Sequence, residues 1–251
     1  MEVCSHSNFG IIRLPISFDD SGTLCWPDAW ETPAIGLDTE RLQQCIEEVR
    51  ARSLSGVFGR HPEFQEADIS CLLELPDLTE VQLWDITLKD ISAIYELPKL
   101  THFRISGKRP PIDFEKLTSV QHLVLEHHKN DTGISTLTKL KMMNLWRFKA
   151  KVKETFEFGL PKGIKELGIF WSNVESLEGF GICPNVKTLE VERCRNLQSL
   201  GDLKTTFPKL EHLVVHACGR LTAEEAKRAL TGHMSIKHAF AGKQLIVSSK
   251  S

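Results

Sequence analysis

Two cysteines are the residues whose type and spacing in this chain first suggest chemistry. Cys194 and Cys218 occupy the same place in two similar stretches, VKTLEVERCRNL and LEHLVVHACGRL. Paired thiols can form a redox site or bind zinc. However, no CxxC pair occurs, and no metal-site spacing relates the remaining cysteines, Cys4, Cys25, Cys45, Cys71 and Cys183. Because free cysteine is among the most buried residue types, we expect Cys194 and Cys218 to be packing residues.

Histidines raise a second possibility, a metal site. His102 and His122 occupy matching places in LTHFRI and VQHLVL, and Glu126 and the pair His127-His128 are close by. Zinc takes three or four ligands in tetrahedral geometry, which a flat ladder of strands seldom supplies. We therefore expect these residues to belong to a recognition surface, and we predict no metal and no cofactor.

Motifs of the common catalytic sites are absent. The chain has no GxSxG elbow, no P-loop, no glycine-rich dinucleotide turn and no HExxH. Residues 1–53 are the only part in which we can imagine a concealed active site. We expect that the protein is not an enzyme.

The composition is that of an ordinary globular protein. The 251 residues are 41% hydrophobic and 25% charged, and the formal net charge is -2 from 31 basic and 33 acidic residues. Nucleic-acid binding usually comes with a strong basic field, so we expect no nucleic-acid partner.

Location is predicted from segments that the sequence lacks. The first thirty residues hold no apolar run of signal-peptide length, and no apolar run approaches the roughly 20 residues of a membrane span. The seven cysteines are an odd number in a chain long enough not to need disulfides. We expect a cytoplasmic protein with no membrane contact.

An internal repeat organises most of the chain. Six-residue stretches with apolar first, fourth and sixth places begin at residues 54, 78, 100, 120, 140, 164, 186 and 210. In order they read LSGVFG, LTEVQL, LTHFRI, VQHLVL, LKMMNL, IKELGI, VKTLEV and LEHLVV, the first of them degraded. A period in the low twenties over eight units is typical of a solenoid.

These stretches resemble the leucine-rich repeat family, whose pattern is LxxLxLxxN/C. The last two repeats match best, with Cys194 and Cys218 at the ninth place and Leu197 and Leu221 at the twelfth. Earlier repeats depart from the pattern, with Ile86, Lys108, His128, Phe148 and Ser172 at the ninth place. The resemblance implies an α/β solenoid with a curved parallel sheet on the concave face and irregular or helical returns on the convex face. We expect the returns of the earlier repeats to be the irregular ones.

The same fold follows from side-chain periodicity. Fourth and sixth residues of a strand share one face, so stacked units bury them in a continuous core. Capping segments are predicted at both ends: a hairpin and a helix from Asp38 to about Arg52, and a helix that begins at Thr222 followed by a strand in KQLIV. The predicted organisation is residues 1–53 as N-terminal cap, 54–221 as repeats and 222–251 as C-terminal cap.

Third, fifth and seventh places of each repeat must then form the open face. Large aromatic residues occupy several of them, which is the composition of a binding hot spot. The alternative is that these rings fold down onto the sheet or are covered by a neighbouring loop. There the acids outnumber the arginines, which favours a partner with a basic surface. The five acids are Glu80, Glu126, Glu166, Glu190 and Glu192, and the two arginines are Arg60 and Arg104. The predicted binding residues are Phe58, Arg60, Trp84, His102, Arg104, His122, Glu126, Trp146, Glu166, Phe170, Trp171, Glu190, Glu192 and His216.

Members of the leucine-rich repeat family are mostly recognition modules. We therefore expect a protein that binds another protein on its concave face, as an inhibitor or a bacterial immunity protein that occludes a toxin. The alternative is an adaptor or substrate-recognition subunit of a larger complex such as a ubiquitin ligase.

Overall fold

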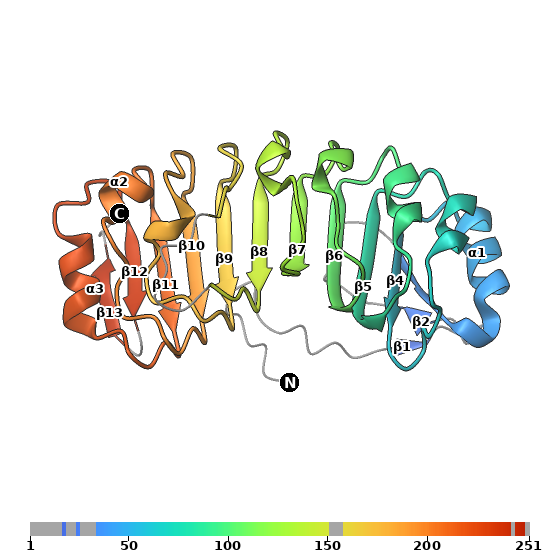
Figure 1. Cartoon of the computed structure of the whole chain (residues 1–251), viewed down its shortest axis with the longest axis horizontal. Helices are drawn as coiled ribbons and strands as arrows, with labels where there is room; N and C mark the ends of the chain where they lie inside the picture. Colours follow the sequence, from blue (N-terminus) through green and yellow to red (C-terminus); the bar gives the residue numbers. More distant parts are fainter. Residues whose placement is uncertain (1–16, 19–23, 26–33, 151–157, 242–243, 249–251) are drawn as a thin grey trace.

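The structure is a computed structural model that describes residues 17–18, 24–25, 34–150, 158–241 and 244–248. Its strands form a single sheet in chain order, from β1 at one edge to β13 at the other (Figure 1). They are β1 (Ser17–Phe18), β2 (Leu24–Cys25), β3 (Ala34–Leu37), β4 (Gly56–Arg60), β5 (Glu80–Thr87), β6 (His102–Lys108), β7 (His122–Glu126), β8 (Met142–Trp146), β9 (Glu166–Phe170), β10 (Thr188–Glu192), β11 (His212–His216), β12 (His238–Ala241) and β13 (Gln244–Ser248).

Strands β3 to β12 are all parallel, and equivalent places of neighbouring repeats pair with each other. Leu189, for example, lies between Leu167 and Leu213. The predicted α/β solenoid with a parallel sheet is thus confirmed. The sheet curves from α1 (Leu42–Ala51) at one end to α3 (Ala223–Leu230) at the other (Figure 1).

The fourth and sixth places form the core, as the periodicity predicts. Leu189 and Val191 are fully buried, and so are Cys194 and Leu197 of the bend that follows. The equivalent residues of the other repeats, from Val57 to Val215, belong to the same continuous cluster, except Gly59 at the sixth place of the first repeat. One unit of this size could not bury its apolar face alone, so stacking of the units supplies the core.

Return segments are short helical turns that lie toward the edge where the strands begin (Figure 1). Besides the turn Thr39–Arg41 that leads into α1, they are Ser70–Glu74, Ser92–Glu96, Phe114–Lys116, Ile134–Thr136, Glu178–Phe180 and α2 (Leu203–Thr206). The predicted caps of the end helices are present: Asp38 accepts from the N–H of Glu40, and the Thr222 hydroxyl accepts from the N–H of Glu225.

At both ends the sheet extends beyond the predicted repeats. β3 lies before α1 and pairs in parallel with β4, and β12 pairs in parallel with β11. Their sequences, AIGL and HAFA, are too short to show the repeat pattern. β1 and β2 pair antiparallel as a hairpin would, although the other residues of the predicted hairpin lie outside the described residues. The division into two caps and a repeat region stays a prediction.

The eighth place of most repeats has an unusual backbone. Five non-glycine residues there, Asp85, Arg147, Trp171, Arg193 and Ala217, have φ between 52° and 55°. This left-handed conformation costs free energy for an L-residue. Backbone hydrogen bonds compensate at three of these positions, because each N–H donates to a carbonyl of the next strand: Arg147 to Phe170, Trp171 to Glu192 and Arg193 to His216, all at 2.9 Å.

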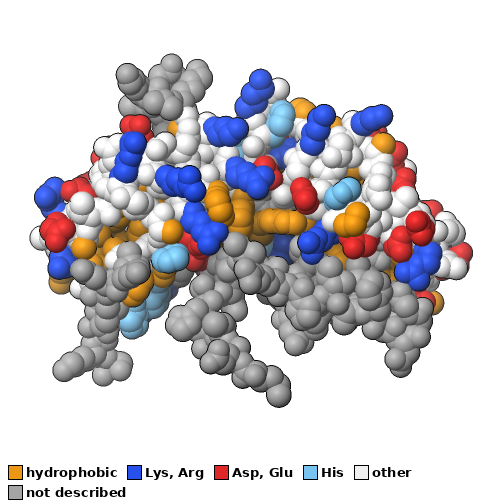
Figure 2. Space-filling view, turned by 90° about the horizontal axis from the view of Figure 1, so that it is seen from below, with side chains coloured by type: hydrophobic (Ala, Val, Ile, Leu, Met, Phe, Trp, Pro, Cys, Tyr) orange, Lys and Arg blue, Asp and Glu red, His pale blue; other side chains and the backbone are white. Residues whose placement is uncertain are grey.

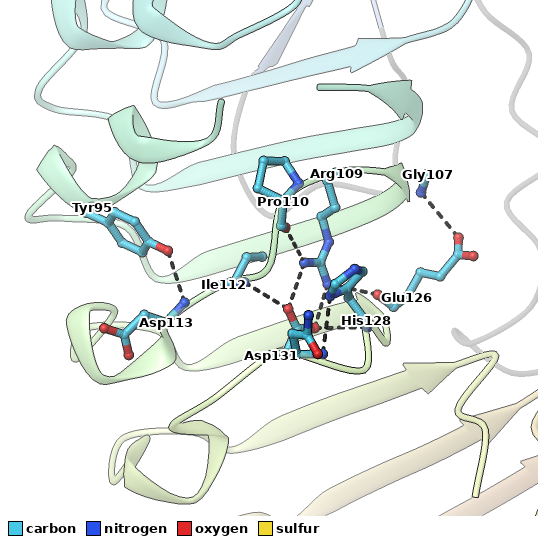
Figure 3. A network of polar contacts seen from close by, with 10 residues as sticks. Tyr95, Gly107, Arg109, Pro110, Ile112, Asp113, Glu126, His128 and Asp131 are labelled. Carbon is cyan, nitrogen blue, oxygen red and sulfur yellow. Dashed lines mark hydrogen bonds and ion pairs between the residues drawn. The ribbon is translucent and has the colours of Figure 1, made fainter. Parts of the chain in front are cut away.

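The repeats that lack a ninth-place cysteine are held by other contacts. Arg109 and Asp131 form a fully buried ion pair after β6 and β7, with Nη1–Oδ1 at 2.8 Å and Nη2–Oδ2 at 2.7 Å. Asp131 also accepts from the backbone N–H groups of Ile112 and His128. The Arg109 guanidinium donates to the carbonyls of Pro110 and Glu126 as well (Figure 3). This network supplies the bend hydrogen bonds in this part of the solenoid.

Candidate partner-binding surface

An aromatic row, formed by Trp84, Trp146 and Phe170, crosses the middle of the concave face. The ring centroids of Trp84 and Trp146 are 5.7 Å apart in an edge-to-face arrangement at 89°. Trp146 stacks on Phe170 at 5.0 Å and 25°. Strands β6 and β7 lie between the two tryptophans, and the small Ser106 at the seventh place of β6 leaves room for the indoles to meet. Both tryptophans are half-buried.

Two predicted contact residues, Phe58 and Phe170, are buried, so the expectation that they are exposed is wrong. Each is 1% exposed. Phe170 folds down over Gly168, where a Cβ atom would lie 2.3 Å from the phenyl ring. Phe58 pairs with Gly36 of β3, which has no side chain to keep the ring off the sheet. In both places a glycine allows the ring to lie against the sheet.

The floor beneath the aromatic row is polar and incompletely hydrogen-bonded. Gln82 and Asn144, at the fifth place of β5 and β8, are 4% and 7% exposed. Their side-chain oxygens, and the indole nitrogen of Trp146, are buried without a hydrogen-bond partner. Arg104, another fifth-place residue, lies 3.6 Å from Glu80 in an ion pair. Glu80 is fully buried, which corrects the expectation that it contributes charge to the surface.

The predicted acidic part of the face carries less charge than its sequence suggests. Only Glu166 is an exposed carboxylate there without an ion pair among the described residues. Glu192 contacts Arg193 at 3.2 Å and His216 at 3.9 Å. Glu190 is buried, and its burial, together with the charge of Glu192, raises its pKa to about 7. The expectation of an exposed Glu190 is wrong. On this face its strand neighbours are Gly168 and Val214, whose side chains supply no hydrogen bond to the buried carboxyl group.

The remaining predicted residues are spread along the strands. His102 and His122 are neighbours with ring centroids 4.3 Å apart, in agreement with matching places on adjacent strands. Arg60 is exposed at the end of β4, and His216 at the end of β11. In the described ranges no group of three or more His, Cys, Asp or Glu side chains could hold a metal ion.

The two thiols lie in the bends as packing residues. Cys194 is fully buried, and its Sγ donates to the carbonyls of Ile169 and Glu192. Cys218 makes the equivalent contacts with Val191 and His216. The hydrogen bond with Cys218 and burial raise the pKa of Cys194, which keeps it a thiol at neutral pH.

Two exposed residues that the sequence pattern did not single out, Arg147 and Arg193, lie where the strands end. They accompany the predicted Trp171, which is 41% exposed and lies under the Arg193 guanidinium at 4.6 Å. Arg147 stands beside it with 64% of its side chain exposed. Figure 2 looks onto this edge and shows hydrophobic side chains in the middle, with lysine and arginine side chains around them. The sequence could have indicated these residues by their place in the repeat. The eighth place lies outside the alternation of the strand, so its side chains belong to neither face of the sheet.

No helix in the described part of the chain is long and apolar enough to cross a membrane. The sequence matches no protein-family model and no curated protein. Among solved structures, the functional domain of InlJ from Listeria monocytogenes, which includes a cysteine ladder, is similar with 12% identity and a TM-score of 0.40. The match covers 79% of this chain and 50% of that one, so the chain spans about half the length of InlJ's functional domain. The assignment as a repeat solenoid rests on the parallel sheet and the repeats of this chain itself.

Proposed function

We propose that this chain is a non-enzymatic recognition protein that binds another protein on its concave face. The contact between Trp84 and Trp146 is the observation that carries the proposal. Tryptophan is enriched among the residues that dominate binding energy. Because the two indoles already hold each other in place, they lose little conformational freedom when a partner covers them. The half-buried pair thus has the properties of a central anchor.

Occlusion is the mode of action that we propose, as an inhibitor or an immunity protein that covers the working surface of a toxin. A surface that runs over several parallel strands suits a broad contact better than a small ligand. Five cysteines are free among the described residues, Cys45, Cys71, Cys183, Cys194 and Cys218, and they support a reducing, cytoplasmic setting. On the concave face itself, a basic area of the partner would lie against Glu166, which is exposed and has no ion pair among the described residues.

Affinity capture with the double variant Trp84→Ala/Trp146→Ala tests the proposal. We expect the protein recovered by the wild-type chain to be lost, because the anchor is removed. Leu73→Ala is the matched control, since Leu73 is 51% exposed on a return segment away from this face. Unchanged recovery by the tryptophan variant, with its circular dichroism spectrum intact, contradicts the concave-face assignment.

Inhibition is tested on the captured protein itself. If that protein is toxic or enzymatic, its co-expression with the wild-type chain should restore growth or suppress the activity, and the tryptophan variant should not. Capture without any effect on the partner's activity would contradict the inhibitor role while leaving the binding surface in place.

A further inference from the structure

We propose that the edge where β6 to β10 end binds an acidic protein segment. We call this edge the basic edge; it consists of Lys108, Lys129, Arg147, Lys149 and Arg193 with Trp171 among them. The inference rests on the proposed function, because it names the chemistry of a second part of the same partner, at the edge where these strands end. At this edge the partner is acidic, whereas the glutamates of the sheet favour a basic area over the concave face.

Three free ammonium groups are the first argument. Lys108, Lys129 and Lys149 are exposed, and no ion pair joins them to other described residues. Lys129 and Lys149 lie three residues beyond Glu126 and Trp146, which pair across β7 and β8. Like charges on adjacent repeats repel each other, and a bound carboxylate relieves that repulsion.

The geometry of the eighth place is the second argument. Arg147, Trp171 and Arg193 come from three consecutive repeats, and all have the left-handed backbone. Their N–H groups are fixed by the neighbouring strand, so the side chains are carried outward from a rigid backbone. Arg193 is further held over the Trp171 ring. Because Glu192 contacts the Nε side of the guanidinium at 3.2 Å, the two Nη groups of Arg193 are the ones that can meet a carboxylate of the partner.

Fixed acids along the edge decide between two kinds of partner. Glu126 accepts from Arg147 at 3.0 Å and from the N–H of Gly107 at 3.2 Å, and Glu192 pairs with Arg193. A nucleic-acid backbone carries closely spaced phosphates and would meet these carboxylates, whereas separate Asp or Glu side chains can be placed between them. The basic edge therefore fits an acidic polypeptide.

The test uses a fluorescein-labelled poly-glutamate peptide and measures its fluorescence anisotropy with the full chain. We expect Lys129→Glu/Lys149→Glu to weaken binding by about tenfold or more. The matched control is Lys139→Glu/Lys165→Glu, which changes net charge equally but places it where β8 and β9 begin. This control should bind the peptide within about twofold of wild type.

Equal weakening by both double variants would overturn the inference, because it would show a response to net charge alone. Tighter binding of a single-stranded oligonucleotide than of the peptide would overturn it as well. Failure of the proposed function would be seen in a different experiment. Trp84→Ala/Trp146→Ala would then capture the native partner normally, independently of the result of the peptide-binding assay.

Discussion

Glu190 shows how one residue on the concave face combines surface position with burial. Its side chain points to the open side of β10, yet it is 6% exposed and has a pKa raised to about 7 by burial and by Glu192. A carboxyl group in such a place binds its proton more tightly in the folded than in the unfolded chain. The stabilisation linked to that proton is therefore present below pH 4.5, the ordinary pKa, and is lost as pH rises through about 7.

Glu190→Gln should remove this pH dependence. The amide has the shape of the protonated acid and cannot ionise, so the variant should match wild type at acidic pH and exceed it above neutral pH. We expect a gain on the order of 3 kcal/mol at pH 8, because the pKa is raised from 4.5 to about 7 and each pKa unit corresponds to about 1.4 kcal/mol. Urea denaturation followed by circular dichroism at several pH values measures it. Glu166→Gln, at an exposed position, is the control, and a difference between Glu190→Gln and wild type that does not vary with pH would refute the assignment.

At the scale of elements, the bends after the strands determine how each repeat is closed. Cys194 and Cys218 close the last repeats with thiol contacts, while Arg109 and Asp131 close an earlier region with a buried ion pair. Burial of an ion pair costs the desolvation of both charges, so the pair itself adds little to the stability of the fold. Removal of one partner lowers stability far more, because the other charge is left buried and unpaired. The two kinds of bend differ in chemistry, but in both a side-chain group, a thiol or a guanidinium, donates hydrogen bonds to backbone carbonyls.

Asp131→Asn should destabilise the protein by about 3–5 kcal/mol, because it leaves the Arg109 guanidinium buried without a counter-charge. Urea denaturation provides the measurement. Asp77→Asn removes the carboxylate of an exposed pair with Lys99 and should change stability by less than about 1 kcal/mol. Equal effects of the two substitutions would mean that the buried pair is better solvated than its burial indicates.

The elements also show why the sequence predicts the core better than the surface. Leu189 and Val191 belong to a period-two pattern, so their inward direction follows from the strand alone. Phe170 occupies an outward place by the same pattern, but its ring folds over Gly168, two residues earlier in the same strand. The Arg109–Asp131 pair joins residues 22 positions apart without any repeat signature. Side-chain directions that follow from the repeat period could be predicted. A side-chain direction that depends on a neighbouring glycine, or on one ion pair between distant residues, could not.

For the whole molecule, each repeat contacts mainly its two neighbours along the sheet. The eight predicted repeats all align in register with the strands β4 to β11, which is why the fold was readable from sequence. Stability in such an array is approximately a sum of repeat and nearest-neighbour interface contributions. Damage to one repeat should therefore remain local in a way that damage to a single globular core would not.

Leu123→Ala and Leu213→Ala test this locality at equivalent places. Both leucines are buried at the fourth place of their repeats, in β7 near the middle and in β11 near the C-terminal end. Each substitution should cost about 2–5 kcal/mol through lost burial and a cavity. Hydrogen exchange followed by mass spectrometry should show faster exchange in β11 to β13 for Leu213→Ala with β4 to β7 unchanged. Leu123→Ala should instead accelerate β6 to β8 first, because it weakens the interfaces on both sides. Uniform acceleration along the chain in both variants would mean that the solenoid opens as one cooperative unit.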